Sequence, residues 1–163
     1  MIIKLKNKDK LLIDEFEFEC CIGKGGLSKN KKEGDKCTPK GIYTLGKVYY
    51  RPDRVRMPKT NLIKKKISKN YGWCDDPHNS KYNKEVKLKN KVKAEKLFRK
   101  DASYDIFIVI NYNKNKIKAF KGSAIFLHLT KNYKPTNGCI AIKKKDMMIL
   151  LKIIQKKTKI YIN

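Results

Sequence analysis

Residues 104–112 read YDIFIVINY, a run of β-branched and aromatic side chains that predicts the strongest strand of the protein. Two shorter apolar segments downstream, 124–129 and 139–142, predict two further strands. The loop between them holds Pro135 and Gly138, residues that commonly interrupt regular structure. These three segments favour a mainly β fold.

The rest of the chain extends this β pattern toward both termini. Residues 2–5, 11–22 and 42–50 alternate or run apolar, with many β-branched and aromatic side chains, and predict strands. A last strand is expected around Tyr161. Residues 23–41 are rich in glycine and proline, so they predict a loop with turns.

Helical signals are confined to two places. Asp146 is a suitable N-cap for a helix over 147–157. Four apolar side chains of that segment share one face: Met147, Leu150, Leu151 and Ile154. Residues 51–100 form a long lysine-rich, irregular region with a short helix expected at 93–100. The prediction is therefore a mainly β domain with one or two helices.

Length and composition indicate one domain over residues 1–163, expected to be a monomer. A hydrophobic fraction of 40% is enough for a packed core. No stretch approaches the roughly 20 apolar residues that span a bilayer. Charged residues interrupt every apolar run near the N-terminus, so no secretory signal is evident. Cytoplasmic location, an unusual export route and prior removal of a leader all stay open.

The formal net charge of +26 comes almost entirely from lysine, which is spread along the whole chain. Four of the 41 basic residues are arginine: Arg51, Arg54, Arg56 and Arg99. Proteins that read bases more often use arginine and interleave aromatic residues with a basic stripe. No specific nucleic-acid partner is therefore expected, although this charge attracts polyanions non-specifically. A compositional bias and a functional basic surface both account for the lysines.

Neither a metal nor a nucleotide cofactor is expected. Cys74 and His78 have metal-like spacing, but a structural zinc site takes four ligands. The GKGG segment at 23–26 fits neither the dinucleotide-binding nor the P-loop pattern. Five cysteines leave at least one unpaired within a monomer.

The segments GSAIFLHL (122–129) and PTNGCI (135–140) carry the chemistry. A thiol nucleophile needs a base within hydrogen-bond reach, and that base needs a group that orients it. His128, at the end of one strand, can meet Cys139, at the start of the next, if the two strands are neighbours. Gly138 lets backbone N–H groups approach a developing oxyanion.

With these segments in place, the chain resembles the L,D-transpeptidase catalytic domain (YkuD-type), in the branch whose nucleophile motif reads PT-x-GC rather than SHGC. The resemblance is strongest over residues 20–155. The matching positions are Gly25, Gly26, KEGD at 32–35, TPKG at 38–41, WCDDP at 73–77, YN at 82–83, Arg99, Asp101, YD at 104–105, Asn113, and the block from Gly122 through His128 to Cys139.

The resemblance implies a β-sandwich catalytic domain that acts on peptidoglycan tetrapeptide stems without a metal or organic cofactor. Cys139 would attack the carbonyl between the third residue and D-alanine, and His128 would accept the thiol proton. The backbone carbonyl of Leu129 would orient the imidazole ring. Backbone N–H groups around Gly138 and Cys139 would hold the oxyanion. A neighbouring stem amine would then resolve the thioester to a 3→3 cross-link.

The sequence departs from the commoner family motif in two places. Asn137 stands where that motif has histidine, and Ala141 stands where it has arginine or asparagine. Another cation would then have to bind the substrate carboxylate, and Arg99 and Lys121 are candidates. The simpler interpretation of both residues is that they are solvated charges on the surface. Further candidate substrate contacts lie at Thr136, Asn137 and Trp73, of which Trp73 also fits a core role.

Two alternatives remain open from the sequence. Water as acceptor would make the domain an L,D-carboxypeptidase, and a catalytically idle domain would be a basic wall-binding module. A papain-like protease is disfavoured because its nucleophile precedes its histidine by a long interval. The resemblance implies a place in the cell envelope or periplasm.

Overall fold

The strand expected at 104–112 is β11 (Ile106–Ile110) in a computed structural model that describes residues 1–88 and 93–163. It pairs antiparallel with β6 (Gly41–Tyr50) on one side and with β12 (Phe126–Leu129) on the other. Strand β12 pairs in parallel with β13 (Ile140–Ile142). The strand that carries His128 and the strand that follows Cys139 are therefore neighbours, which is the condition for the two residues to meet.

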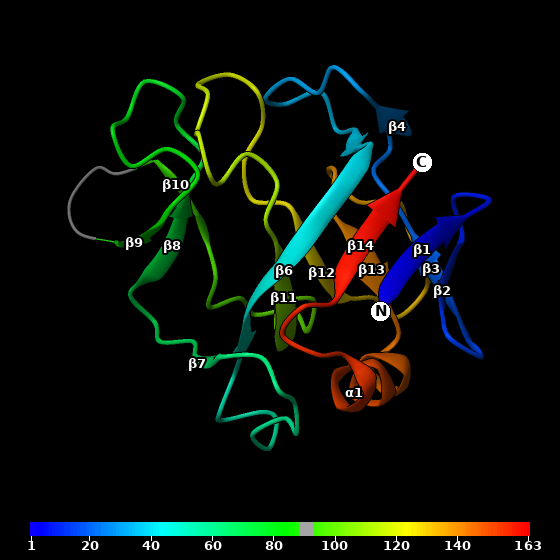
Figure 1. Cartoon of the computed structure of the whole chain (residues 1–163). Coiled ribbons are helices and arrows are strands. Elements are labelled where there is room, and N and C mark those ends of the chain that lie inside the picture. Colours follow the sequence, from blue (N-terminus) through cyan, green and yellow to red (C-terminus); the bar gives the residue numbers. More distant parts are fainter. Residues whose placement is uncertain (89–92) are drawn as a thin grey trace.

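The remaining strands continue this sheet until it closes on itself. The order is β11-β12-β13-β3-β2-β1-β14-β6-β7, and β11 also pairs with β6, which closes the ring. The additional strands are β1 (Ile2–Lys6), β2 (Lys10–Ile13), β3 (Phe16–Cys21), β7 (Lys64–Lys66) and β14 (Lys159–Ile162). Strands β3 and β6 each pair with both halves of the ring, so the domain is a β-sandwich whose two sheets share their edge strands (Figure 1).

Alternation along the strands separates two apolar clusters. On β12, Leu127 and Leu129 point into the main core between the sheets, whereas Phe126 belongs to a second cluster on the outer face. Strand β11 is buried on both faces because Phe107 and Val109 join that outer cluster. By the same alternation His128 lies on the outer face with Phe126.

A small antiparallel sheet, β10-β8-β9, contributes to the outer cluster (Figure 1). Its strands are β8 (Tyr71–Cys74), β9 (Glu85–Lys87) and β10 (Ala94–Lys96). The prediction of a short helix at 93–100 was therefore wrong. Ala94 and Lys96 pair with Cys74 and Gly72 of β8, and this pairing overrides the helix propensity of the segment. Within the predicted loop, β4 (Leu27–Ser28) and β5 (Thr38–Pro39) form a short parallel pair.

The described residues contain one α-helix, α1 (Lys144–Ile153), which closes one end of the sandwich. Its four predicted apolar residues all reach the main core. The predicted limits and cap were wrong: Lys143 occupies the N-cap without a side-chain hydrogen bond, and Asp146 lies in the first turn. The helix ends early because Ile154 adopts extended backbone angles. Within the described residues, no helix has the length and apolar character that a membrane span requires.

Candidate active site

Cys139 immediately precedes β13 and presents its thiol on the outer face of the sandwich. Ile140 and Ile142 point into the main core, whereas Cys139 belongs to the outer cluster. The thiol donates a hydrogen bond to the Ala124 carbonyl (3.2 Å), and the Phe126 N–H donates to the sulfur (3.3 Å). The loop and strand that precede His128 thus hold the sulfur directly.

His128 is fixed by its own strand. Its Nδ1 lies 3.0 Å from the carbonyl oxygen of Leu129, the residue that the resemblance implied would orient the ring. A carbonyl only accepts hydrogen bonds, so Nδ1 carries the proton in this contact and Nε2 of the neutral ring is the basic atom. The ring also packs edge-on against Tyr104, with centroids 5.3 Å apart.

Burial moves the pKa values of these two groups in opposite directions. It lowers the pKa of His128 to about 4, against the favourable bond to Leu129. It raises the pKa of the Cys139 thiol to about 12; the charge of Glu95 acts in the same direction, and the Phe126 N–H and Lys31 oppose it. At neutral pH the resting pair is therefore a thiol and a neutral imidazole.

What distinguishes Cys139 from the other cysteines is its access to a cavity. Burial also raises the pKa of Cys20 to about 12, but that thiol lies in the main core. Cys139 instead lines a cavity of about 1310 Å³, together with His128. A nucleophile and a base that line the same cavity can act on the same substrate, although the resting thiol donates to the Ala124 carbonyl and not to the imidazole.

Most of the predicted substrate contacts surround the same cavity. Six of the nine candidate site residues named from the sequence line it: Cys139, His128, Leu129, Thr136, Asn137 and Arg99. Trp73 is not brought there. It is 3% exposed, packs edge-on against Phe126 and donates its indole N–H to Asn83. Trp73 therefore packs within the outer cluster and does not line the cavity.

Gly138 shapes the turn that carries the nucleophile. Its φ is +131°, and a Cβ at this position would lie 2.9 Å from the Cys37 carbonyl oxygen. The Gly138 N–H donates to Thr136 Oγ1 (3.1 Å), and the Thr136 hydroxyl donates to the Cys139 carbonyl (2.6 Å). The Thr38 hydroxyl donates to the Gly138 carbonyl (2.8 Å), which ties the turn to the glycine-rich loop.

The sequence matches the YkuD family of L,D-transpeptidase catalytic domains over residues 4–162. The chain belongs to this family. A search of curated proteins gives no match.

Among solved structures, this L,D-transpeptidase domain is similar to the helical cell shape determining protein Pgp2 from Campylobacter jejuni. The TM-score is 0.56 at 18% sequence identity, and the match covers 99% of this chain. It covers 46% of the Pgp2 chain, so the domain spans less than half the length of that structure. At this identity the likeness shows the shared fold.

Two acidic groups, Glu33 and Glu95, also line the cavity of the L,D-transpeptidase domain. Glu33 belongs to the KEGD segment that matches the family, whereas Glu95 lies outside the matching segments. The Tyr104 hydroxyl donates to Glu95, and Ser123 and Tyr82 donate to Glu33. Burial raises the pKa of Glu95 above its ordinary value. Glu95 reaches the cavity from strand β10. The sequence predicted a helix for this segment, and Glu95 was therefore not identified as a site residue.

Arg99 is held among these acidic groups. Its guanidinium pairs with Asp101 at 2.8 Å, lies 3.7 Å from Glu95 and stacks over the Tyr104 ring. Arg99 was a candidate for binding the substrate carboxylate. It lines the cavity, but Asp101 and Glu95 already neutralise part of its positive charge. Lys121, the other candidate, does not line this cavity.

Proposed function

We propose that this domain is a cysteine-dependent L,D-transpeptidase acting on peptidoglycan tetrapeptide stems. The observation that carries the proposal is that Cys139 and His128 line the same large cavity, His128 on β12 and Cys139 immediately before the neighbouring parallel strand β13. Family membership supports the substrate class. A stem peptide is an extended chain, and a cavity of about 1310 Å³ has room for its reacting residues.

In the first half-reaction, Nε2 of His128 accepts the thiol proton as the sulfur attacks the carbonyl carbon before D-alanine. The resting thiol is neutral, so this transfer accompanies attack rather than preceding it. We assign the oxyanion to the Cys139 N–H, since the Gly138 N–H is engaged by Thr136. The imidazolium then protonates the leaving nitrogen, the C–N bond breaks, and D-alanine departs from a Cys139 thioester.

In the second half-reaction, an amine of a neighbouring stem attacks the thioester carbonyl. His128 accepts the amine proton and returns it to the sulfur as the C–S bond breaks. The product is a 3→3 cross-link, and water in place of the amine gives a tripeptide. A domain that acts on such substrates would work in the cell envelope, and the cross-links that it forms would contribute to cell shape.

The test is mass analysis of peptidoglycan fragments after incubation with the protein. Dimers with a 3→3 cross-link, in which the donor stem has lost its D-alanine, support transpeptidation, whereas tripeptides alone indicate the carboxypeptidase alternative. Cys139→Ser should abolish both products and labelling by a carbapenem, and Cys37→Ser should retain them. If the protein binds to the cell wall but forms neither product, the domain is a basic wall-binding module and not an enzyme.

A further inference from the structure

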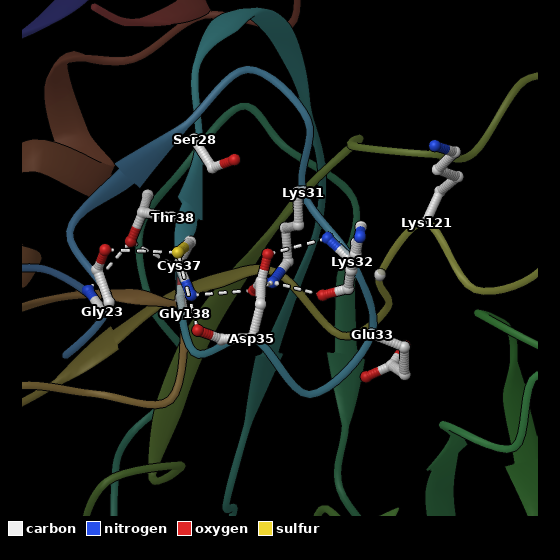
Figure 2. Close-up of polar contacts among 12 residues, drawn as sticks. Gly23, Ser28, Lys31, Lys32, Glu33, Asp35, Cys37, Thr38, Lys121 and Gly138 are labelled. Atoms are coloured by element: carbon white, nitrogen blue, oxygen red, sulfur yellow. Dashed lines mark hydrogen bonds and ion pairs between the residues drawn. The ribbon is translucent and has the colours of Figure 1, made fainter.

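Lys31 differs from the other lysines of the described chain because its side chain is buried. The side chain is 4% exposed, and Lys31 is the lysine among the buried polar residues of the described ranges. Its ammonium pairs with Asp35 Oδ1 at 2.7 Å and lies 3.5 Å from the Lys32 carbonyl oxygen. Figure 2 shows the Lys31 and Asp35 side chains meeting within the glycine-rich loop, with Lys121 apart from them. A buried ammonium is costly to keep unless it is paired.

Gly122 makes room for the Lys31 side chain. A Cβ on Gly122 (φ +98°) would lie 2.7 Å from Lys31 Cε, which is too close for two carbon atoms. The ammonium ends beside Gly138, because a Cβ on Gly138 would lie 3.5 Å from Lys31 Nζ, an ordinary contact distance. The charge of Lys31 is therefore next to the residue that precedes Cys139.

Asp35 fixes the ammonium without occupying the cavity. Its carboxylate also accepts the backbone N–H groups of Lys32 (2.7 Å) and Cys37 (2.9 Å). Burial alone would raise the pKa of Asp35, but these bonds and Lys31 hold it below its ordinary value. Lys31 lines the cavity and Asp35 is not among its lining residues. The lysine of the pair thus borders the reaction space, and its carboxylate partner does not.

Three titratable or charged groups act on the Cys139 thiol: Glu95 from β10, Tyr104 from the turn before β11, and Lys31 from the glycine-rich loop at 23–41. His128, on β12, lines the same cavity. Glu95 opposes formation of a thiolate, and neutral His128 carries no charge to offset it. Of these groups, Lys31 is the cation whose charge favours the thiolate.

We propose that Lys31 is a positioning residue whose ammonium, anchored by Asp35 beside Gly138, stabilises the negative charge that develops on Cys139 during attack. The reaction in which this charge develops rests on the proposed function. The effect on the thiol does not, because any electrophile small enough to enter the cavity reports on it. The sequence alone does not point to Lys31, because in a lysine-rich chain nothing in the sequence distinguishes this lysine from its neighbours.

The experiment measures alkylation of Cys139 by iodoacetamide between about pH 7 and 10, read at the Cys139 peptide by mass spectrometry. Below the thiol pKa, the rate follows the thiolate fraction, so a rise of one unit in pKa slows alkylation tenfold at every pH in this range. Lys31→Met should slow alkylation by roughly tenfold, whereas Lys31→Arg should stay within about threefold of the native rate because it keeps the charge.

Lys32→Met is the matched control, since it removes the same charge from an exposed side chain of the same loop. It should leave the rate unchanged within about twofold, because exposed charges are screened. Unfolding of Lys31→Met would release Cys139 from burial and speed alkylation, the opposite sign to the expected result. Circular dichroism establishes that each variant is folded. In the folded chain, a Lys31→Met rate equal to that of Lys32→Met, or faster, overturns the proposal. Because no stem peptide is involved, failure of the transpeptidase proposal would leave this outcome interpretable.

Discussion

At the scale of single residues, burial governs the candidate site. One physical cause, loss of hydration, lowers the pKa of His128 and raises that of Cys139, so both are neutral at rest. A neutral imidazole next to a neutral thiol suits a general-base step. The sequence could predict this pair because His128 and Cys139 stand in recognisable segments. It could not predict Lys31 or Glu95, whose roles depend on which of many similar side chains become buried.

The depressed pKa of His128 predicts a specific loss of stability in acid. The unfolded state binds a proton at the ordinary pKa of about 6.5, and the folded state binds it only near about 4. Protonation therefore favours unfolding, so this contribution to stability is complete above pH 6.5 and is lost as the pH falls toward 4. The difference in unfolding free energy between the native chain and His128→Gln should change by about 3 kcal/mol between pH 7 and pH 4.

Urea unfolding of both chains at several pH values measures this difference. Repulsion among the lysines also grows in acid, but it is common to both chains and cancels in the comparison. A difference that stays constant from pH 7 to pH 4 would show that His128 is not desolvated in the folded protein.

At the scale of elements, the sequence predicted strands better than it predicted helix limits. Alternation and β-branched content located the sandwich strands because only a register that keeps the alternating apolar residues on one face buries them in the core. The segment at 93–100 misled because Ala94, Glu95 and Lys96 favour helix locally, while pairing with β8 decides the structure. The prediction that Asp146 caps the helix was wrong because the helix begins two residues earlier, at Lys144. Packing of its apolar side chains in the main core determines where the helix begins.

The first turn of α1 therefore carries an unfavourable charge that can be corrected. Lys145 is exposed near the positive end of the helix dipole, and Lys152 is exposed near the negative end. Lys145→Glu should stabilise the fold relative to Lys152→Glu by about 1 kcal/mol at low salt. Both substitutions change the net charge equally, so their difference isolates the helix dipole from general repulsion.

Thermal or urea unfolding of the two variants in parallel provides the measurement. The difference should shrink at about 1 M salt, where the Debye length falls to about 3 Å. Equal stabilities at low salt would mean that the helix ends are already screened.

At the scale of the whole molecule, the charge of the surface and that of the cavity differ. The chain carries a formal charge of +26, but acidic side chains balance much of the basic charge around the cavity. The acidic lining residues are Glu33, Asp75, Glu95, Asp101 and Asp105. The basic ones are Lys31, Lys36, Arg54, Arg99, Lys100, Lys131, Lys134 and Lys144. The strong positive charge thus belongs mainly to surfaces away from the reaction space.

This distribution predicts that salt should affect polymer binding and chemistry differently. Retention of the protein on an anionic wall polymer depends on many surface lysines and should fall more than about tenfold between about 0.1 M and 1 M salt. The kcat/KM for an isolated stem tetrapeptide should change less than about threefold over the same range, because the mixed cavity gives little long-range attraction. Sedimentation with the polymer and turnover at sub-saturating peptide supply the two measurements. A tenfold fall in kcat/KM over the same salt range would mean that the surface lysines also attract the stem peptide. The encounter rate would then depend on the charge of the whole surface and not on the mixed charges that line the cavity.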